Sequence, residues 1–236
     1  MTIAELSWID GIAVACFLAM LFGWGRIALL IDGGKSLNAS MHQVRRAWMQ
    51  RMLERPDRIV DAALTGHTVS SLSFFSSANI IIIAGLFGLL GKADDAHSVI
   101  SAWPFVPAAS TGLVQLKIFG LICVLAYGFF RFTWALRQYN YCCALIGAAP
   151  LPGTMHPHRI ELADQVAIVF TSALRSFGAG IRCYYFAIAW VCWIAGPIAL
   201  LLATGVITLM LFRRQTISHS ARAIKRYNEL NPPREI

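Results

Sequence analysis

The chain has 236 residues, of which 57% are hydrophobic and only 14% are charged, whereas a soluble domain has about 25% charged residues. The apolar residues are gathered in long runs, which excludes an ordinary soluble domain. The formal net charge of +8 does not indicate a nucleic-acid partner, because Lys and Arg lie mainly between and after the apolar runs, where anionic lipid headgroups lie. We therefore expect a single all-α integral membrane domain, followed by a basic tail at residues 213–236.

Four apolar stretches are long enough to cross a hydrocarbon core of about 30 Å, which takes about 20 helical residues. They are residues 8–30, 69–90, 114–136 and 183–212. The second stretch has no charged residue at all. The fourth is longer than a perpendicular helix requires, and tilt or a kink at Gly196-Pro197 would absorb the surplus. The sequence thus predicts about four transmembrane helices.

Two amphipathic helices are predicted at the membrane surface, besides a short surface helix in the tail. The first follows stretch 8–30, is basic, and ends near Pro56. Its apolar stripe consists of Met41, Val44, Trp48 and Met52. The second is predicted at 161–181, where Asp164 and Arg175 interrupt the apolar face. An alternative is that this second segment is a fifth span whose Arg175 is neutralised inside the bundle.

The distribution of Lys and Arg predicts the topology. The first loop carries six of them from Lys35 to Arg58, whereas the second carries one Lys beside two Asp residues. By the positive-inside rule the N-terminus lies outside and the first and third loops lie in the cytoplasm, as in a multi-pass protein of the bacterial inner membrane. The tail disagrees, because four spans leave it outside although it holds six Lys and Arg residues from Arg213 to Arg234. A fifth span, or a re-entrant segment broken at Gly196-Pro197, would remove the conflict.

Four motifs carry a family resemblance. They are Arg46-x-Trp48-Met49, the run Ser73 to Asn79, Phe129-Phe130-x-Phe132-x-Trp134-x-x-Arg137-Gln138-Tyr139-Asn140-Tyr141, and Gly180-x-Arg182-x-Tyr184-Tyr185. Through them the chain resembles the bacterial and plant membrane family catalogued as domain of unknown function number 599, over nearly its whole length. The resemblance implies a membrane fold. It gives no indication of a reaction, substrate or cofactor, because none is assigned to that family. Within these motifs Phe130, Trp134, Tyr139, Asn140 and Tyr185 form the candidate aromatic motif.

Polar residues of the second stretch form a candidate packing site. Ser70, Ser73 and Ser77 share one helix face, and Asn79 follows them. In lipid, small hydroxyl side chains let helices approach closely and form hydrogen bonds across the contact. A polar pathway through the membrane is the alternative interpretation.

Arginine residues near the expected inner side form a candidate anion, headgroup or partner site. They are Arg45, Arg46, Arg131, Arg137, Arg175 and Arg182. If several converge, they can bind an anion, a lipid headgroup or a carboxylate of a partner. The alternative is that they anchor the topology and form ion pairs with acidic residues, chiefly Asp61 or Asp164.

Catalytic and metal signatures are not evident. The segment Met155-His156-Pro157-His158 offers only two metal ligands, and no nucleophile or phosphate-loop motif occurs. We predict no catalytic residue, metal or cofactor, and expect a non-enzymatic subunit that associates with itself or with a larger membrane complex, in contact with membrane lipids and anionic headgroups. The alternatives are an oligomeric channel or transporter for a small anion, and an enzyme that interacts with lipid or quinone.

Overall fold

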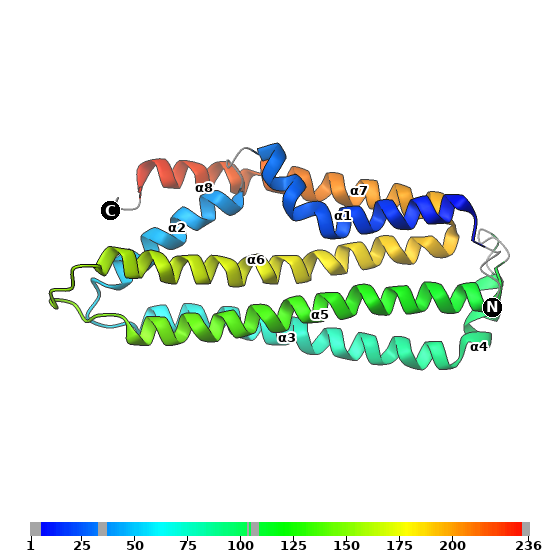
Figure 1. The fold of residues 1–236 in the computed structure, drawn as a ribbon, viewed down its shortest axis with the longest axis horizontal. Coiled ribbons are helices and arrows are strands. Elements are labelled where there is room, and N and C mark those ends of the chain that lie inside the picture. The colour runs from blue at the N-terminus through cyan, green and yellow to red at the C-terminus, as the bar shows by residue number, and fades with distance from the viewer. Residues whose placement is uncertain (1–5, 33–36, 103, 105–108, 233–236) are drawn as a thin grey trace. The chain divides into compact units, whose positions relative to one another are not determined.

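The computed structural model describes residues 6–32, 37–102, 104 and 109–232, so Lys35 and Arg234 of the topology prediction lie outside the described residues. Within those ranges the chain forms helices and no strand, which confirms the all-α class (Figure 1). In chain order the elements are α1 (Trp8–Asp32), α2 (Leu37–Met52), α3 (Ile59–Gly91), α4 (Ala93–Ser101), α5 (Thr111–Ala148), α6 (Arg159–Val191), the 3-10 turn η2 (Cys192–Ala195), α7 (Pro197–Thr216) and α8 (His219–Leu230).

Five segments of the described chain are long and apolar enough to cross a membrane. They are Trp8–Ile27, Ile59–Gly91, Thr111–Ala148, Arg159–Ala195 and Pro197–Leu230. Because a run of about 20 apolar helical residues spans the hydrocarbon core, the chain is a helical membrane protein.

The last helix boundaries differ from those expected, and the structure corrects them. The expected interfacial helix at 161–181 is the first part of α6, because Asp164 and Arg175 interrupt only the apolar pattern and no proline interrupts the helix. The expected stretch 183–212 is instead divided at Gly196, whose φ of 118° is a conformation suited to glycine. Pro197 then begins α7, where its missing N–H costs nothing.

The helices gather in two compact units. Unit 1 comprises Met1–Ala28, Ser77–Phe130 and Ala179–Phe212, and unit 2 comprises Leu29–Ser76, Arg131–Gly178 and Arg213–Ile236. By sequence, unit 1 holds four basic and four acidic residues, whereas unit 2 holds sixteen basic and eight acidic residues. The whole net charge of the protein therefore belongs to unit 2.

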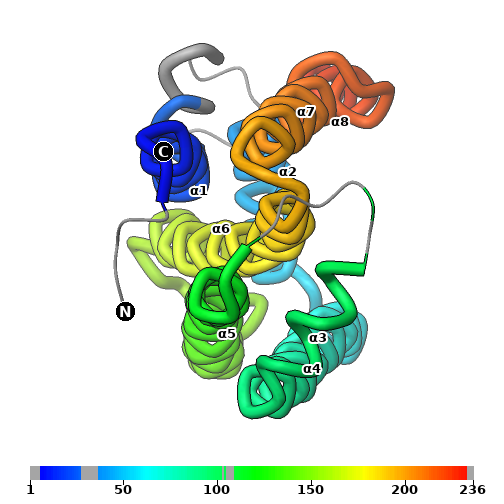
Figure 2. The backbone as a smooth tube through the Cα atoms, turned by 90° about the vertical axis from the view of Figure 1, so that its right-hand side faces the viewer, coloured from blue at the N-terminus to red at the C-terminus, as the bar shows by residue number. Residues whose placement is uncertain are grey.

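Unit 1 has an aromatic core. The Phe17 ring of α1 lies edge-on to Phe186 and Trp190 of α6, at centroid distances of 5.6 and 4.9 Å. Figure 2, which looks along the helices, shows this part of α6 between α1 and α5. At Gly120 of α5, an added Cβ would overlap the Trp190 ring, so only glycine permits this helix contact. The close contact also lets Trp190 Nε1 donate to the Lys117 carbonyl oxygen, 2.7 Å away.

Unit 2 packs α2 against α6 and α8. The apolar core contains Met49, Met52, Leu53, Ile146, Ala163, Val166 and Ala167. Trp48 of α2 lies edge-on to Phe170 of α6, with ring centroids 5.3 Å apart. Figure 1 shows α8 beside α2, and Asn228 Nδ2 donates to the Ser40 carbonyl oxygen at 2.8 Å. The predicted amphipathic segment therefore exists as α2, but of its predicted stripe only Met52 is fully buried. The buried side of α2 also includes Arg45 and Met49, whereas Met41, Val44 and Trp48 are half-buried.

Candidate functional site

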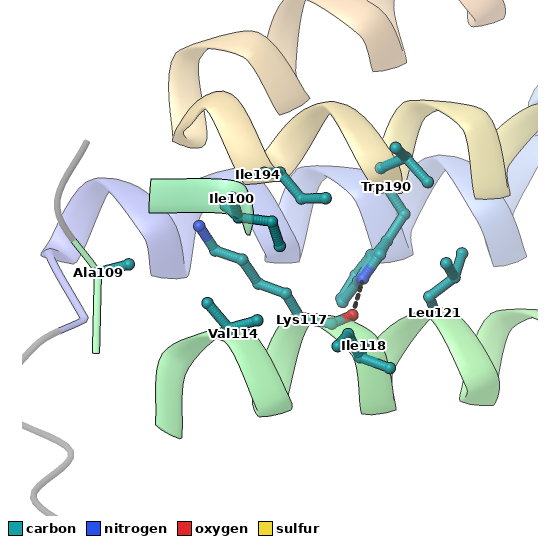
Figure 3. A pocket seen from close by; sticks show the side chains of 9 residues that line it. Ile100, Ala109, Val114, Lys117, Ile118, Leu121, Trp190 and Ile194 are labelled. Atoms are coloured by element: carbon teal, nitrogen blue, oxygen red, sulfur yellow. Dashed lines mark hydrogen bonds between the residues drawn. The ribbon is translucent and has the colours of Figure 1, made fainter. Parts of the chain in front are cut away.

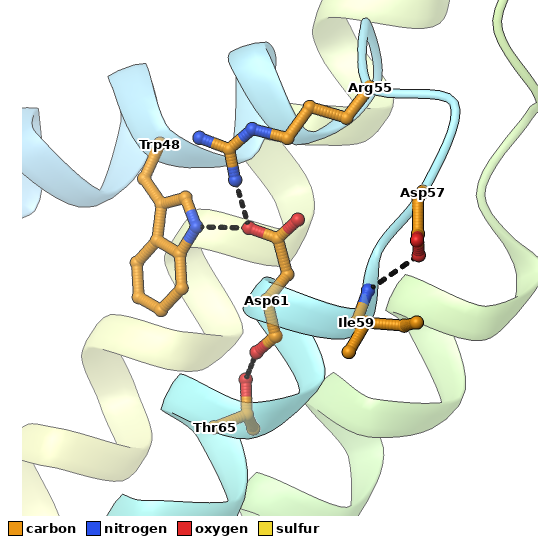
Figure 4. Close-up of polar contacts among 6 residues, drawn as sticks. All are labelled: Trp48, Arg55, Asp57, Ile59, Asp61 and Thr65. Atoms are coloured by element: carbon orange, nitrogen blue, oxygen red, sulfur yellow. Dashed lines mark hydrogen bonds and ion pairs between the residues drawn. The ribbon is translucent and has the colours of Figure 1, made fainter.

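Asp61, in the first turn of α3, is the fully buried centre of one polar cluster in unit 2 (Figure 4). Its Oδ1 accepts hydrogen bonds from Trp48 Nε1 and from the Arg55 guanidinium, both at 2.6 Å. Its Oδ2 is buried and has no hydrogen-bond partner in the part of the chain that the structure describes. The pair with Arg55 neutralises the carboxylate, so this cluster joins the end of α2 to the start of α3.

Asp164 of α6 holds the second cluster. Arg46 of α2 binds it with two nitrogen atoms, Nε to Oδ1 at 2.7 Å and Nη2 to Oδ2 at 2.6 Å. Gln50 Nε2 also donates to Oδ1, at 3.0 Å. A bidentate contact of this kind is the strongest geometry for an Arg–carboxylate pair. Arg46 therefore forms a stable ion pair with Asp164.

A third cluster surrounds the hydroxyl of Thr171 on α6. Arg45 Nη1 donates to Thr171 Oγ1 at 3.3 Å, and Nδ1 of His42 lies 3.0 Å from the same oxygen. A hydroxyl can accept from a guanidinium while it donates to a neutral imidazole. Burial, together with the nearby charge of Arg175, lowers the pKa of Arg45 to about 10. This cluster is therefore rich in positive charge.

The structure separates the other predicted arginines. Arg131, Arg137 and Arg175 belong to unit 2 and Arg182 belongs to unit 1. Arg131 is half-buried, and its Nε is a buried atom that lacks a hydrogen-bond partner among the described residues. Arg137 and Arg175 are exposed. Within unit 2, electrostatic interactions connect Arg175 to Arg45.

The predicted polar set of the second stretch divides between two faces of α3. Ser70, Ser73 and Ser77 are exposed, whereas Asn79 is fully buried. Asn79 Nδ2 donates to the Leu125 carbonyl oxygen at 2.8 Å and joins α3 to α5 within unit 1. Helical spacing places the three serines together, but of these four residues only Asn79 forms a hydrogen bond with another helix within the described part of the chain.

The candidate aromatic motif does not form one binding surface. Tyr139 is fully buried, with its ring edge-on to Phe170 at a centroid distance of 5.1 Å. Phe130, Trp134 and Asn140 are exposed. Tyr185 is half-buried.

A small cavity of about 40 Å³ lies in unit 1 and is almost entirely apolar (Figure 3). Its walls include Ile100, Val114, Ile118, Leu121, Trp190 and Ile194. Lys117 is its one charged lining residue, and its Nζ donates to the Trp193 carbonyl oxygen at 2.9 Å. This anchor has a signal in the sequence, because Lys117 and Arg131 are the two cations of the apolar stretch 114–136.

The two histidines of the ligand-like segment do not gain a third ligand. His156 and His158 have ring centroids 6.4 Å apart, and His158 Nδ1 lies 3.2 Å from a carboxylate oxygen of Glu161. Within the described ranges no three His, Cys, Asp or Glu residues are placed to hold a metal ion.

Comparison with known proteins gave one match. The family described as "Protein of unknown function, DUF599" matches residues 12–220, which confirms the resemblance noted in the sequence. No curated protein matched the chain, and no solved structure matched it.

Proposed function

We propose a function for this chain, which belongs to the family described as protein of unknown function DUF599: it is a non-enzymatic subunit that self-associates through α3 in the bacterial inner membrane. The observation that carries the proposal is a stripe of small, exposed residues along α3.

Five spans give an orientation that agrees with the charges. An odd number of spans puts the two termini on opposite sides, so an outside N-terminus leaves the basic tail in the cytoplasm. Unit 2 collects the end of α1, the start of α3, the end of α5, the start of α6 and the chain after α7. Five alternating passages bring these segments to one side, and they carry the whole net charge of +8. The conflict left by four spans is thereby removed.

The stripe, which we call the small face, occupies one side of α3. It consists of Gly66, Ser70, Ser73, Ser77, Ala84 and Gly88, all of which are exposed. Between Ser77 and Ala84 the face is interrupted by the exposed side chains of Ile80 and Ile81. The buried residues Asp61, Leu72 and Asn79 lie on a different side of the helix. Only 6% of the apolar window of α3 is buried, compared with 22–44% in the other candidate spans of the described chain. The rest of the chain therefore covers little of this helix.

Packing within the chain does not explain the glycines of the small face. A Cβ added at Gly66 or at Gly88 would meet no atom within 4 Å. Glycine in a helix costs about 1 kcal/mol relative to alanine, and in membranes small residues let two helices approach closely. The small face is uncharged and matches itself under two-fold symmetry, so its occupant is a second copy of the chain.

Cysteine cross-linking tests the proposal. In a full-length background in which the six native cysteines are replaced, Ser77→Cys lies on the small face, and Ile82→Cys lies on another exposed side of the same helix. Oxidation in native membranes should give a disulfide-linked dimer with Ser77→Cys and much less with Ile82→Cys. Equal yields for the two variants, or no dimer from either, would refute association through the small face.

Binding of an amphiphile is a second candidate function, favoured by the cavity beside Lys117. A small, partly open apolar slot with one cationic side chain suits the end of an acyl chain whose molecule carries a negative group. Mass spectrometry of the purified protein should detect a bound anionic lipid or quinone that Lys117→Met loses and the exposed variant Lys92→Met keeps. If both variants retain the same ligand, the cavity is not its site.

A further inference from the structure

Arg45 is a buried cation without a counter-ion. Its side chain is 92% buried, given an exposure of 8%. Its one hydrogen-bond partner among the described residues is the neutral hydroxyl of Thr171, and its Nε has none. Buried charges in proteins are ordinarily paired, because removal of an ion from water costs several kcal/mol. The two buried carboxylates of the same unit do not compensate Arg45, since Asp61 binds Arg55 and Asp164 binds Arg46.

Further positive charge surrounds Arg45. Arg175 on α6 repels both Arg45 and a protonated His42, and Arg46 also acts on His42. Asp164 is the one acidic group that acts on this histidine. With His42 neutral, three guanidinium groups face one carboxylate, which leaves about two positive charges uncompensated. Such an excess of positive charge destabilises a protein core unless an anion compensates it.

We propose that Arg45, Arg175, His42 and Thr171 form a binding site for a phosphate-type oxyanion. A doubly charged anion matches the uncompensated charge, and guanidinium groups bind phosphate oxygen atoms through charge-assisted hydrogen bonds. The free Nε of Arg45 supplies a donor that no described residue uses. The Thr171 hydroxyl, already in contact with Arg45 and His42, supplies another polar group.

The cluster reaches the surface at Arg175. Arg175 is exposed and His42 is half-buried, so the positive charges extend from the surface to the buried Arg45. The same oxyanion chemistry belongs to free inorganic phosphate and to the headgroup of a phosphate lipid such as phosphatidic acid. Neither the membrane topology nor the small face enters this inference.

Thermal unfolding of the full-length protein in a neutral detergent tests the site. Inorganic phosphate should raise the unfolding midpoint relative to chloride at equal ionic strength. The apparent phosphate affinity should fall at least about tenfold in Arg45→Gln, as expected for loss of a charged hydrogen bond. Arg51→Gln is the matched control, because it removes the same charge from an exposed position of α2, and it should bind as the wild type does.

Lipid nanodiscs separate the two sources of the anion. If phosphate alone has no effect but phosphatidic acid stabilises the wild type more than phosphatidylcholine does, and Arg45→Gln loses that difference, the ligand is a lipid headgroup. If wild type, Arg45→Gln and Arg51→Gln respond alike to phosphate and to phosphatidic acid, the proposal is overturned.

Two further variants distinguish a loss of binding from a failure of Arg45→Gln to fold. Arg175→Gln changes an exposed residue, and it should fold normally while it weakens phosphate or headgroup binding. Without ligand, Arg45→Met should be as stable as the wild type or more stable, because it removes an uncompensated buried charge. A large loss of stability in Arg45→Met, with unchanged binding in Arg175→Gln, would show that the cluster is only structural and would contradict the proposal.

Discussion

Units 1 and 2 differ in the hydrogen-bond partners of their buried polar side chains. In unit 1, Asn79 donates to the Leu125 carbonyl and Lys117 donates to the Trp193 carbonyl, while the buried carboxylate of Asp10 accepts from the uncharged Trp193 indole. In unit 2 the buried carboxylates bind arginine and tryptophan side chains from α2. A hydrogen bond to a main-chain carbonyl satisfies a polar side chain without placing a second charged side chain in the low-dielectric interior, where such charges are costly. The difference suits unit 1 to lipid and unit 2 to a surface near water.

The largest effect is expected at Asp61 of unit 2. The variant Asp61→Ala leaves the Trp48 indole N–H and the Arg55 guanidinium without their acceptor, and it should lower the free energy of unfolding by about 3 kcal/mol or more. In unit 1, Asp10→Ala removes the acceptor of the neutral Trp193 indole and should cost about 1–2 kcal/mol. Denaturation in mild detergent compares the two variants. A larger loss for Asp10→Ala would contradict the contrast between the units.

An intermediate effect is expected from glycine replacement in unit 1. The variant Gly120→Ala forces its new methyl group against the Trp190 ring and should destabilise the protein by about 1–3 kcal/mol. Gly88→Ala is the matched control, because its methyl group meets nothing within 4 Å. It should leave the unfolding midpoint unchanged or raise it by improved helix propensity. Tryptophan fluorescence during unfolding should show the changed Trp190 environment only in Gly120→Ala.

The smallest effect is a pH dependence in unit 2. Burial lowers the pKa of His42 from its ordinary 6.5, as do the charges of Arg45, Arg46 and Arg175, against an opposing effect of Asp164. The unfolded chain therefore binds a proton at a higher pH than the folded chain does. Stability should fall as the pH drops through 6.5, by at most about 1.4 kcal/mol per pH unit, and level off once the folded His42 is protonated.

Unfolding midpoints between pH 7.5 and pH 5 test this dependence. His42→Gln should flatten the curve in that range, whereas His67→Gln, which replaces an exposed histidine of α3, is the matched control. If the pH dependence of the unfolding midpoint is the same in His42→Gln as in the wild type, the pKa of His42 is not lowered by folding.

The sequence predicted the features that depend on local composition. The uncharged stretch 69–90 lies within α3, and the stripe of Met41, Val44, Trp48 and Met52 lies within α2. Gly196-Pro197 was recognised as a possible break because both residues disfavour a continuous helix. These signals lie within a few residues of their effect, so no knowledge of the fold is required to detect them.

The pairings within the candidate sites could not be predicted. Arg46 and Asp164 are 118 positions apart, and Arg45 and Thr171 are 126 apart. Six arginines had similar surroundings in the sequence, and only the packing of α2 on α6 assigns Arg46 to a carboxylate and Arg45 to a hydroxyl. The boundary between the last two long helices was also misplaced: it was expected between the segments 161–181 and 183–212, whereas α6 continues to Val191. Hydropathy records where lipid contact ends and not where a helix ends.

The turn between α6 and α7 has a consequence for how the protein is made. After η2, a single residue, Gly196, precedes α7, and no charged residue occurs from Cys183 to Phe212. Such a connection contains no hydrophilic loop. If one helix entered the bilayer before the other, the apolar second helix would remain exposed to water. The two helices are therefore expected to leave the translocon together as a hairpin, and the ribosome must have synthesised both before either is stably integrated.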